Sequence, residues 1–80
     1  MPMTPLERAA RALCRLDGHP ENATMDRKPL WADYLPEARA VLQAIREPSV
    51  SMLSAADRHD KRDASADAWR AMIDAALAEG

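Results

Sequence analysis

The stretch WADYLPEARAVLQAIREPS, residues 31–49, carries the strongest helix signal in the chain and decides its fold. Its apolar residues recur at the three- and four-residue spacing that places side chains on one face of an α-helix: Leu35, Ala38, Val41, Leu42 and Ile45. We expect Asp33 to be the N-cap, which puts Pro36 in the first turn, where its missing N–H is not needed. Pro48 disfavours helical backbone at the preceding residue. The pattern predicts a helix over residues 34–47.

A second helix signal lies at the start of the chain. Thr4-Pro5-Leu6-Glu7 is a capping box, with threonine as the N-cap, proline at the first helical position and glutamate at the third. The apolar stripe that follows is expected to be buried: Leu6, Ala9, Ala10, Leu13, Cys14 and Leu16. Gly18 suits the position just beyond a helix end. The pattern predicts a helix over residues 5–16, a loop over 17–28 and a short helical turn over 29–33.

Three arginines, Arg8, Arg11 and Arg15, occupy the opposite face of this first helix. We interpret them as a solvated face, and the alternative is a surface that binds a partner. The aromatic residues Trp31 and Tyr34 are expected to form a wall of the core instead of a binding platform.

The chain after Pro48 predicts two further helices. Ser49 is expected to cap a short helix over residues 49–57, with Met52, Leu53 and Ala56 facing inward. A highly charged run, residues 57–63, is interpreted as a solvated linker. Asp63 or Ser65 then caps a helix over residues 65–78. The residues expected to be most buried in the whole chain are Leu13, Leu42, Ile45, Trp69 and Ile73.

Composition indicates a single small domain over residues 1–80 of the all-α class, a bundle of three main helices plus one short helix. Apolar residues make up 48% of the chain, but 17 of them are alanine and none is phenylalanine, so the core is thin. No run alternates apolar with polar residues, so no β-sheet is expected. A homodimer would supplement so small a core.

Charge and cysteine content exclude several classes of protein. A net charge of −2 and a pI near 5.6 argue against general nucleic-acid binding. The single cysteine excludes an internal disulfide bond and suits a reducing cytosol. The chain has no apolar run long enough for a membrane span. We therefore expect a soluble cytoplasmic protein with no direct contact to nucleic acid or membrane.

The residues that carry chemistry do not form a recognisable catalytic or metal-binding pattern. His19 and His59 both fall in predicted loops, and Cys14 lies on an apolar stripe. His59 has Asp57 and Asp60 beside it, but one imidazole and two carboxylates in a charged run rarely bind a metal. The sequence predicts no enzyme, no cofactor and no metal site.

Charge is distributed unevenly along the chain. Residues 1–16 carry three arginines against one acid, whereas residues 63–80 carry four acids against one arginine. The two terminal helices either attract each other, or the acidic one meets a basic partner. For the second case the candidate partner-binding residues are Asp57, Asp60, Asp63, Asp67 and Asp74.

Three segments together resemble a known group of proteins: TPLERAARALC (4–14), WADYLPEARAVLQAIREPS (31–49) and WRAMIDAAL (69–77). They are similar to small proteins of phages and other mobile genetic elements, and the chain resembles the anti-CRISPR inhibitors of type I-C systems. The resemblance implies a protein that binds the host CRISPR-Cas surveillance complex, Cascade, and blocks target-DNA binding. No motif of the group assigns roles to individual residues.

Cascade must hold DNA with basic residues, so the expected mechanism is occupation of that basic surface by carboxylates. Two alternatives remain. The outline of the helices over 34–47 and 49–57 suits a helix-turn-helix DNA-binding regulator of a prophage, although the second of them offers only Arg58 to DNA. The other alternative is a structural accessory protein of the phage particle.

Overall fold

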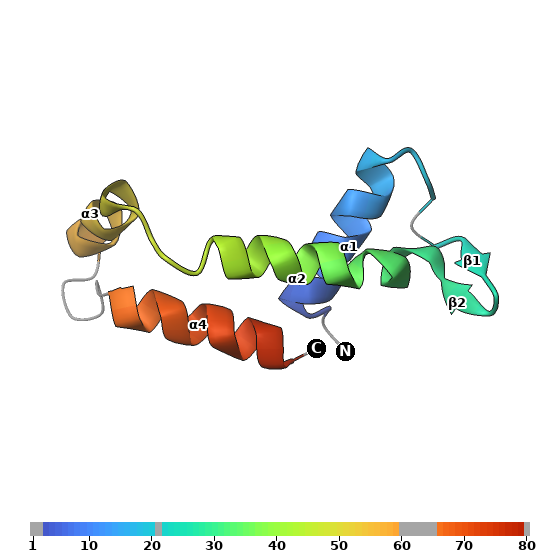
Figure 1. Ribbon diagram of the computed structural model, residues 1–80. Coiled ribbons are helices and arrows are strands. Elements are labelled where there is room, and N and C mark those ends of the chain that lie inside the picture. Colours follow the sequence, from blue (N-terminus) through green and yellow to red (C-terminus); the bar gives the residue numbers. More distant parts are fainter. Residues whose placement is uncertain (1–2, 21, 60–65, 80) are drawn as a thin grey trace.

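The computed structural model describes residues 3–20, 22–59 and 66–79 of the chain. Its helices are α1 (Pro5–Leu16), α2 (Leu35–Ala44), α3 (Val50–His59) and α4 (Ala66–Ala78), and a 3₁₀ helix, η1 (Leu30–Tyr34), leads directly into α2. The predicted all-α class is confirmed. Helix α2 forms the centre, α4 runs antiparallel beside it, α1 crosses its N-terminal half and α3 lies at the opposite end (Figure 1).

The helical arrangement is elongated. The chain measures 47 × 22 × 20 Å, with a radius of gyration of 15.2 Å. A compact domain of this length would have a radius of gyration of about 12 Å. Helix α3 causes much of the difference, because it has no extended contact with any other described element.

The limits of α1 agree with the prediction because they are set by local contacts. The backbone N–H of Glu7 donates to Oγ1 of Thr4 at 3.1 Å, as a capping threonine requires. At the other end the N–H groups of Gly18 and His19 donate back to the carbonyls of Arg15 and Cys14. Gly18 has a φ of 84°, so this is a Schellman motif with glycine in the left-handed region.

The core lies where α1 crosses η1 and α2. Leu6 and Ala10 of α1 and Ala38 of α2 are fully buried against one another, and the two alanines allow the helices to approach closely. The partly buried residues around them are Ala9, Leu13, Trp31, Tyr34, Leu35, Leu42 and Leu77. Trp31 and Tyr34 therefore form a wall of the core, as predicted. Leu16, which was expected to be buried, is 81% exposed because α1 extends beyond α2.

Helix α2 is shorter than predicted at both ends. Asp33 does not cap it, because the 3₁₀ helix continues without a break from Leu30 into Leu35, and Asp33 is exposed within that turn. Pro36 does lie in the first turn, as predicted. The helix ends at Ala44, and Ile45 follows as the C-cap. The indole N–H of Trp69 donates to the carbonyl of Ile45 at 2.8 Å, so α4 satisfies one of the terminal carbonyls of α2.

A small β-hairpin lies at the end of the predicted loop over 17–28 and includes Pro29 of the predicted turn, which corrects the expectation of no β-sheet. Its strands are β1 (Thr24–Met25) and β2 (Lys28–Pro29), paired antiparallel. Asp26 and Arg27 connect them with φ values of 53° and 67°, the backbone that a two-residue type I′ turn needs at both positions. Arginine is unusual there, so the pair lacks the glycine signal by which such turns are recognised.

Helices α3 and α4 begin close to the predicted positions, but the apolar face of α3 differs from the prediction. Ser49 caps α3 as predicted, since its Oγ accepts from the N–H of Met52 at 3.2 Å. Met52 and Ala56 are nevertheless exposed, whereas both were expected to face inward. On α4, Ile73 is buried and Trp69 partly buried, in contact with α2. Asp63 and Ser65, the expected caps of α4, lie outside the described residues.

Candidate functional site

The acidic residues predicted to bind a partner are only partly covered by the structure. Asp67 and Asp74 lie on α4, and both side chains are exposed. Asp60 and Asp63 lie outside the described residues, and so does the side chain of Asp57, although its backbone belongs to α3. The structure thus brings together two of the five candidates on one helix.

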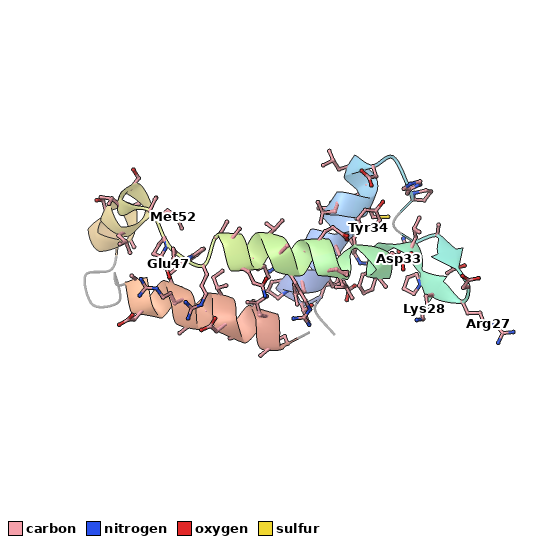
Figure 2. All side chains as sticks on the ribbon, viewed as in Figure 1. Arg27, Lys28, Asp33, Tyr34, Glu47 and Met52 are labelled. Atoms are coloured by element: carbon pink, nitrogen blue, oxygen red, sulfur yellow. The ribbon has the colours of Figure 1, made fainter. Side chains whose placement is uncertain are left out.

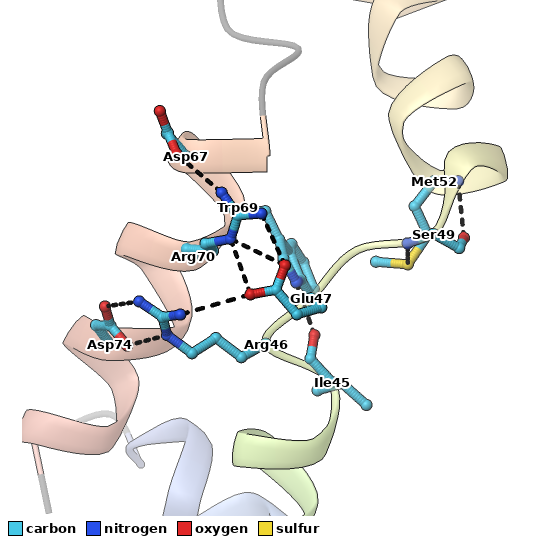
Figure 3. A network of polar contacts seen from close by, with 9 residues as sticks. All are labelled: Ile45, Arg46, Glu47, Ser49, Met52, Asp67, Trp69, Arg70 and Asp74. Carbon is cyan, nitrogen blue, oxygen red and sulfur yellow. Dashed lines mark hydrogen bonds and ion pairs between the residues drawn. The ribbon is translucent and has the colours of Figure 1, made fainter.

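Asp67 and Asp74 both accept hydrogen bonds from arginines of the same chain (Figure 3). Asp74 accepts two hydrogen bonds from the guanidinium of Arg46, at 2.8 and 2.9 Å. Asp67 accepts from Nη1 of Arg70 at 2.9 Å, and Arg70 also donates to the carboxylate of Glu47 at 2.7 Å. Arg46 lies 3.6 Å from Glu47 as well. These contacts connect the segment that follows α2 to α4. We call the residues that make them the junction network: Arg46, Glu47, Asp67, Arg70 and Asp74.

The junction network shifts the protonation of its carboxyl groups. Hydrogen bonding to Arg70 is the largest cause that lowers the pKa of Glu47 below its usual 4.5, and hydrogen bonding to Arg46 lowers the pKa of Asp74 below 3.8. The same bonds raise the pKa of both arginines. All of these side chains are exposed or partly exposed, so water screens the pairs and their role is mainly to orient α4.

Sequence reasoning missed the junction network. Helical spacing places Arg46 on the polar side of the predicted helix over 34–47, and Glu47 ends that prediction just before Pro48. Arg46 and Asp74 are 28 positions apart in the sequence, and Glu47 and Arg70 are 23 positions apart. No local spacing rule relates residues at that separation, so only the antiparallel packing of α2 and α4 reveals the pairing.

The three arginines of α1 line one hollow on the surface. Arg8, Arg11 and Arg15, together with Met3, surround a space of about 300 Å³. Their three- and four-residue spacing places them on the same side of the helix. Arg8 and Arg15 are exposed, and Arg11 is partly buried. We call this surface the arginine hollow.

Arg11 is held firmly at one side of the arginine hollow. Its Nε donates to Oε2 of Glu7 at 2.9 Å, and its Nη1 donates to Oδ1 of Asn22 at 2.9 Å. Its guanidinium also lies 5.0 Å from the centre of the Trp31 ring, within cation–π range. Glu7, Asn22 and Trp31 hold this side chain from different segments of the chain, so the hollow is preorganised on this side.

Tyr34 and Asp17 form a polar contact on the far side of the core wall. The Tyr34 hydroxyl donates to Oδ2 of Asp17 at 2.7 Å. This hydrogen bond is the main reason why the pKa of Tyr34 rises from 10.0 to about 12. The contact ties the end of α1 to η1, which is a structural role.

The remaining candidates do not form a site in the described part of the chain. No group of three potential metal ligands occurs among the described residues. The side chains of His59 and Asp57, and the whole of Asp60, lie outside that description. Cys14 is buried, and its thiol lies 3.8 Å from the carbonyl oxygen of His19.

The arrangement of α2 and α3 differs from that of a helix-turn-helix motif. In that motif the two helices pack against each other across a short turn. Here α3 stands at the end of the molecule without such packing (Figure 1). Within the described residues, no helix combines the length and apolar character that crossing a bilayer requires. No protein-family model matches the chain, and comparison with curated proteins and with solved structures finds no significant match.

Proposed function

We propose that this chain is a non-enzymatic binding protein and that the arginine hollow is the surface with which it binds acidic groups of a partner protein. One observation carries the proposal. Three arginines from a single helix line one hollow of about 300 Å³, on a chain whose net charge is −2. A concentration of positive charge on an acidic protein favours a contact that is specific for negative groups.

The chemistry of the hollow suits carboxylates. A guanidinium presents its N–H donors in a planar fork that matches a carboxylate in bidentate geometry. Arg11 is already oriented by Glu7, Asn22 and Trp31, so binding costs less side-chain entropy there. Met3, which is 48% exposed, adds an adaptable apolar contact at the same place.

We propose further that the partner is the type I-C Cascade complex in the cytoplasm of a host bacterium. Binding would prevent this complex from binding target DNA. The support for this proposal is the resemblance of residues 4–14, 31–49 and 69–77 to small proteins of phages and other mobile genetic elements, and the resemblance of the chain, in its size and kind, to anti-CRISPR proteins. Two of the five acids of the carboxylate mechanism, Asp67 and Asp74, are paired with arginines of this chain. In the carboxylate mechanism, contact with the partner would therefore be made by Asp57, Asp60 and Asp63.

The test measures binding to purified type I-C Cascade, and the DNA binding of that complex, at low and high salt. Arg8→Ala/Arg15→Ala is expected to weaken binding by about tenfold or more, since two charged contacts are lost. Arg11 is left intact because it supports the fold. The matched control is Arg27→Ala/Lys28→Ala, which removes the same charge from the hairpin, where both residues are exposed (Figure 2).

The outcomes separate the alternatives. If Arg8→Ala/Arg15→Ala binds Cascade as the parent does, the arginine hollow is excluded as the binding surface. Weaker binding by Asp57→Lys/Asp60→Lys/Asp63→Lys would then favour the carboxylate mechanism. If the parent chain does not bind Cascade but retards duplex DNA in a gel-shift assay, the result would favour a prophage DNA-binding regulator over an inhibitor. Melting curves establish that each variant is folded.

A further inference from the structure

The arginine hollow carries an exposed positive charge at each of its two ends. Arg8 and Arg15 are both exposed and lie two helical turns apart on α1. At a rise of about 1.5 Å per residue, this spacing separates their backbones by about 10 Å along the helix axis. Residues seven positions apart return to the same side of an α-helix. The two guanidiniums therefore suit a ligand with two negative groups at a similar separation.

The middle of the hollow differs from its ends. Arg11 lies between the two end arginines, and its Nε is 2.9 Å from Oε2 of Glu7, so its charge is balanced within the chain. A further carboxylate placed there would lie close to that of Glu7 and be repelled by it. Met3 lines the same space and is 48% exposed, and its flexible thioether adapts to an apolar group placed against it. The middle therefore suits an apolar side chain.

This order of groups matches one face of an amphipathic α-helix. In a helix that packs along α1, acidic residues at positions i and i+7 lie about 10 Å apart on the same face. Positions i+3 and i+4 lie between them on that face, opposite the middle of the hollow. Anchors at these four positions are a common mode by which proteins recognise a helix.

A nucleic-acid strand matches the hollow less well. It carries a phosphate at every nucleotide, so some phosphates would face the middle, where the carboxylate of Glu7 lies. Nucleic-acid binding proteins also carry an extended basic surface. Here the arginines come from one helix of 12 residues, on a chain whose net charge is −2. Charge complementarity favours an acidic helix of a protein.

We infer that the arginine hollow recognises an amphipathic acidic helix of the partner protein. Acidic residues at i and i+7 of that helix pair with Arg8 and Arg15, and an apolar side chain at i+3 or i+4 packs against Met3. The inference rests on the proposed function, since it uses the same surface, and it adds the secondary structure and the residue pattern of the bound segment.

Titration of the full chain with synthetic peptides, followed by NMR of the α1 backbone amides, tests the inference. The matched peptide is a helical alanine- and glutamine-rich chain of about 20 residues with glutamates at i and i+7 and leucines at i+3 and i+4. Moving the second glutamate to i+5 keeps the composition but puts the acids on different faces, which should weaken binding about tenfold because one charged pair is lost.

Two variants of the protein show where the matched peptide binds. Arg8→Ala/Arg15→Ala should weaken its binding by about tenfold or more, since both charged pairs are lost. Arg27→Ala/Lys28→Ala removes the same charge from the exposed hairpin and should bind the peptide as the parent does. Equal losses in the two variants would overturn the inference, because the peptide would then respond only to overall charge.

Met3→Ala tests the apolar part of the contact. Met3 is exposed and precedes α1, so its replacement leaves the fold intact. The variant should bind the matched peptide about threefold more weakly, because a thioether contact is lost. It should bind a peptide with alanines in place of the two leucines as the parent does, and this dependence identifies the side chains as partners. Equal effects on both peptides would overturn the predicted packing against Met3.

The remaining outcomes separate this inference from the proposed function. If both glutamate spacings bind alike and need Arg8 and Arg15, the hollow binds acidic groups without selecting a helix, so the inference fails and the proposed function stands. The same follows if no peptide binds at millimolar concentration while Arg8→Ala/Arg15→Ala loses Cascade binding. Tighter binding of oligothymidylate than of the matched peptide would replace the helix by single-stranded nucleic acid. Binding of the matched peptide without binding of Cascade would support the inference and remove Cascade as the partner.

Discussion

The two ends of the molecule are held together by different forces. At the α1 end, apolar side chains are removed from water, with Leu6, Ala10 and Ala38 fully buried. At the α3 end, α2 and α4 are joined by ion pairs whose members remain in contact with solvent. Burial of apolar surface is the larger stabilising force, whereas exposed ion pairs contribute little and mainly fix geometry. The α1 end should therefore set stability, and the contacts at the α3 end should contribute less to it.

The largest expected effect is at the centre of the α1 end. Leu6 is fully buried, so Leu6→Ala should lower the free energy of unfolding by about 2–5 kcal/mol, as core truncations of leucine do. In a domain with so thin a core, this change is expected to leave much of the protein unfolded at 37 °C. Urea denaturation followed by circular dichroism measures it. Leu16→Ala, in the same helix but at an exposed position, should stay within about 0.5 kcal/mol of the parent. Equal losses in the two variants would contradict the assigned core.

Two isoleucines compare the ends directly. Ile73 is 6% exposed, so Ile73→Ala should cost about 2–4 kcal/mol. Ile45 was predicted to be equally buried but is 43% exposed, and Ile45→Ala should cost about 1 kcal/mol or less. Both are measured by urea denaturation followed by circular dichroism. A larger loss for Ile45 would show that its side chain is covered by other parts of the chain.

Acid should loosen the junction network while the α1 end stays folded. The folded-state pKa values of Glu47 and Asp74 lie below the ordinary 4.5 and 3.8, so their contribution to stability is complete above those values and is lost as the pH falls through the lowered ones. The NMR resonance of the Trp69 indole N–H, which donates to the Ile45 carbonyl, reports the change. In Arg46→Gln, the pKa of Asp74 should return towards 3.8. An unchanged titration of Asp74 in that variant would show that Arg46 is not its partner in solution.

The smallest effect is expected at Tyr34, the only tyrosine in the chain. Its pKa is raised to about 12, so the Asp17 contact stabilises the fold below pH 10 and is lost as the pH rises through 12. Absorbance of the phenolate measures the titration directly. Asp17→Asn should lower the midpoint towards 10, with little change in stability at neutral pH. A midpoint near 10 in the parent would mean that the hydroxyl does not donate to Asp17.

Local features of the sequence were sufficient to define the all-α class and the limits of α1. Thr4, Pro5 and Gly18 act within one turn of the helix ends, so their effects can be predicted without knowledge of the fold. Ser49 predicts the start of α3 for the same reason. The arginines of α1 were also identified as one face, because helical spacing alone determines it.

Tertiary packing decided which of the apolar faces are buried and which of the charges are paired. Periodicity shows that Val41 and Ile45 lie on an apolar face, but burial depends on whether another helix reaches it, and α1 covers only the first half of α2. Asp74 reads as an exposed acid in the sequence, yet Arg46, 28 positions away, lies beside it once α4 packs antiparallel to α2. Local rules act over one helical turn, whereas these contacts depend on how whole helices are arranged.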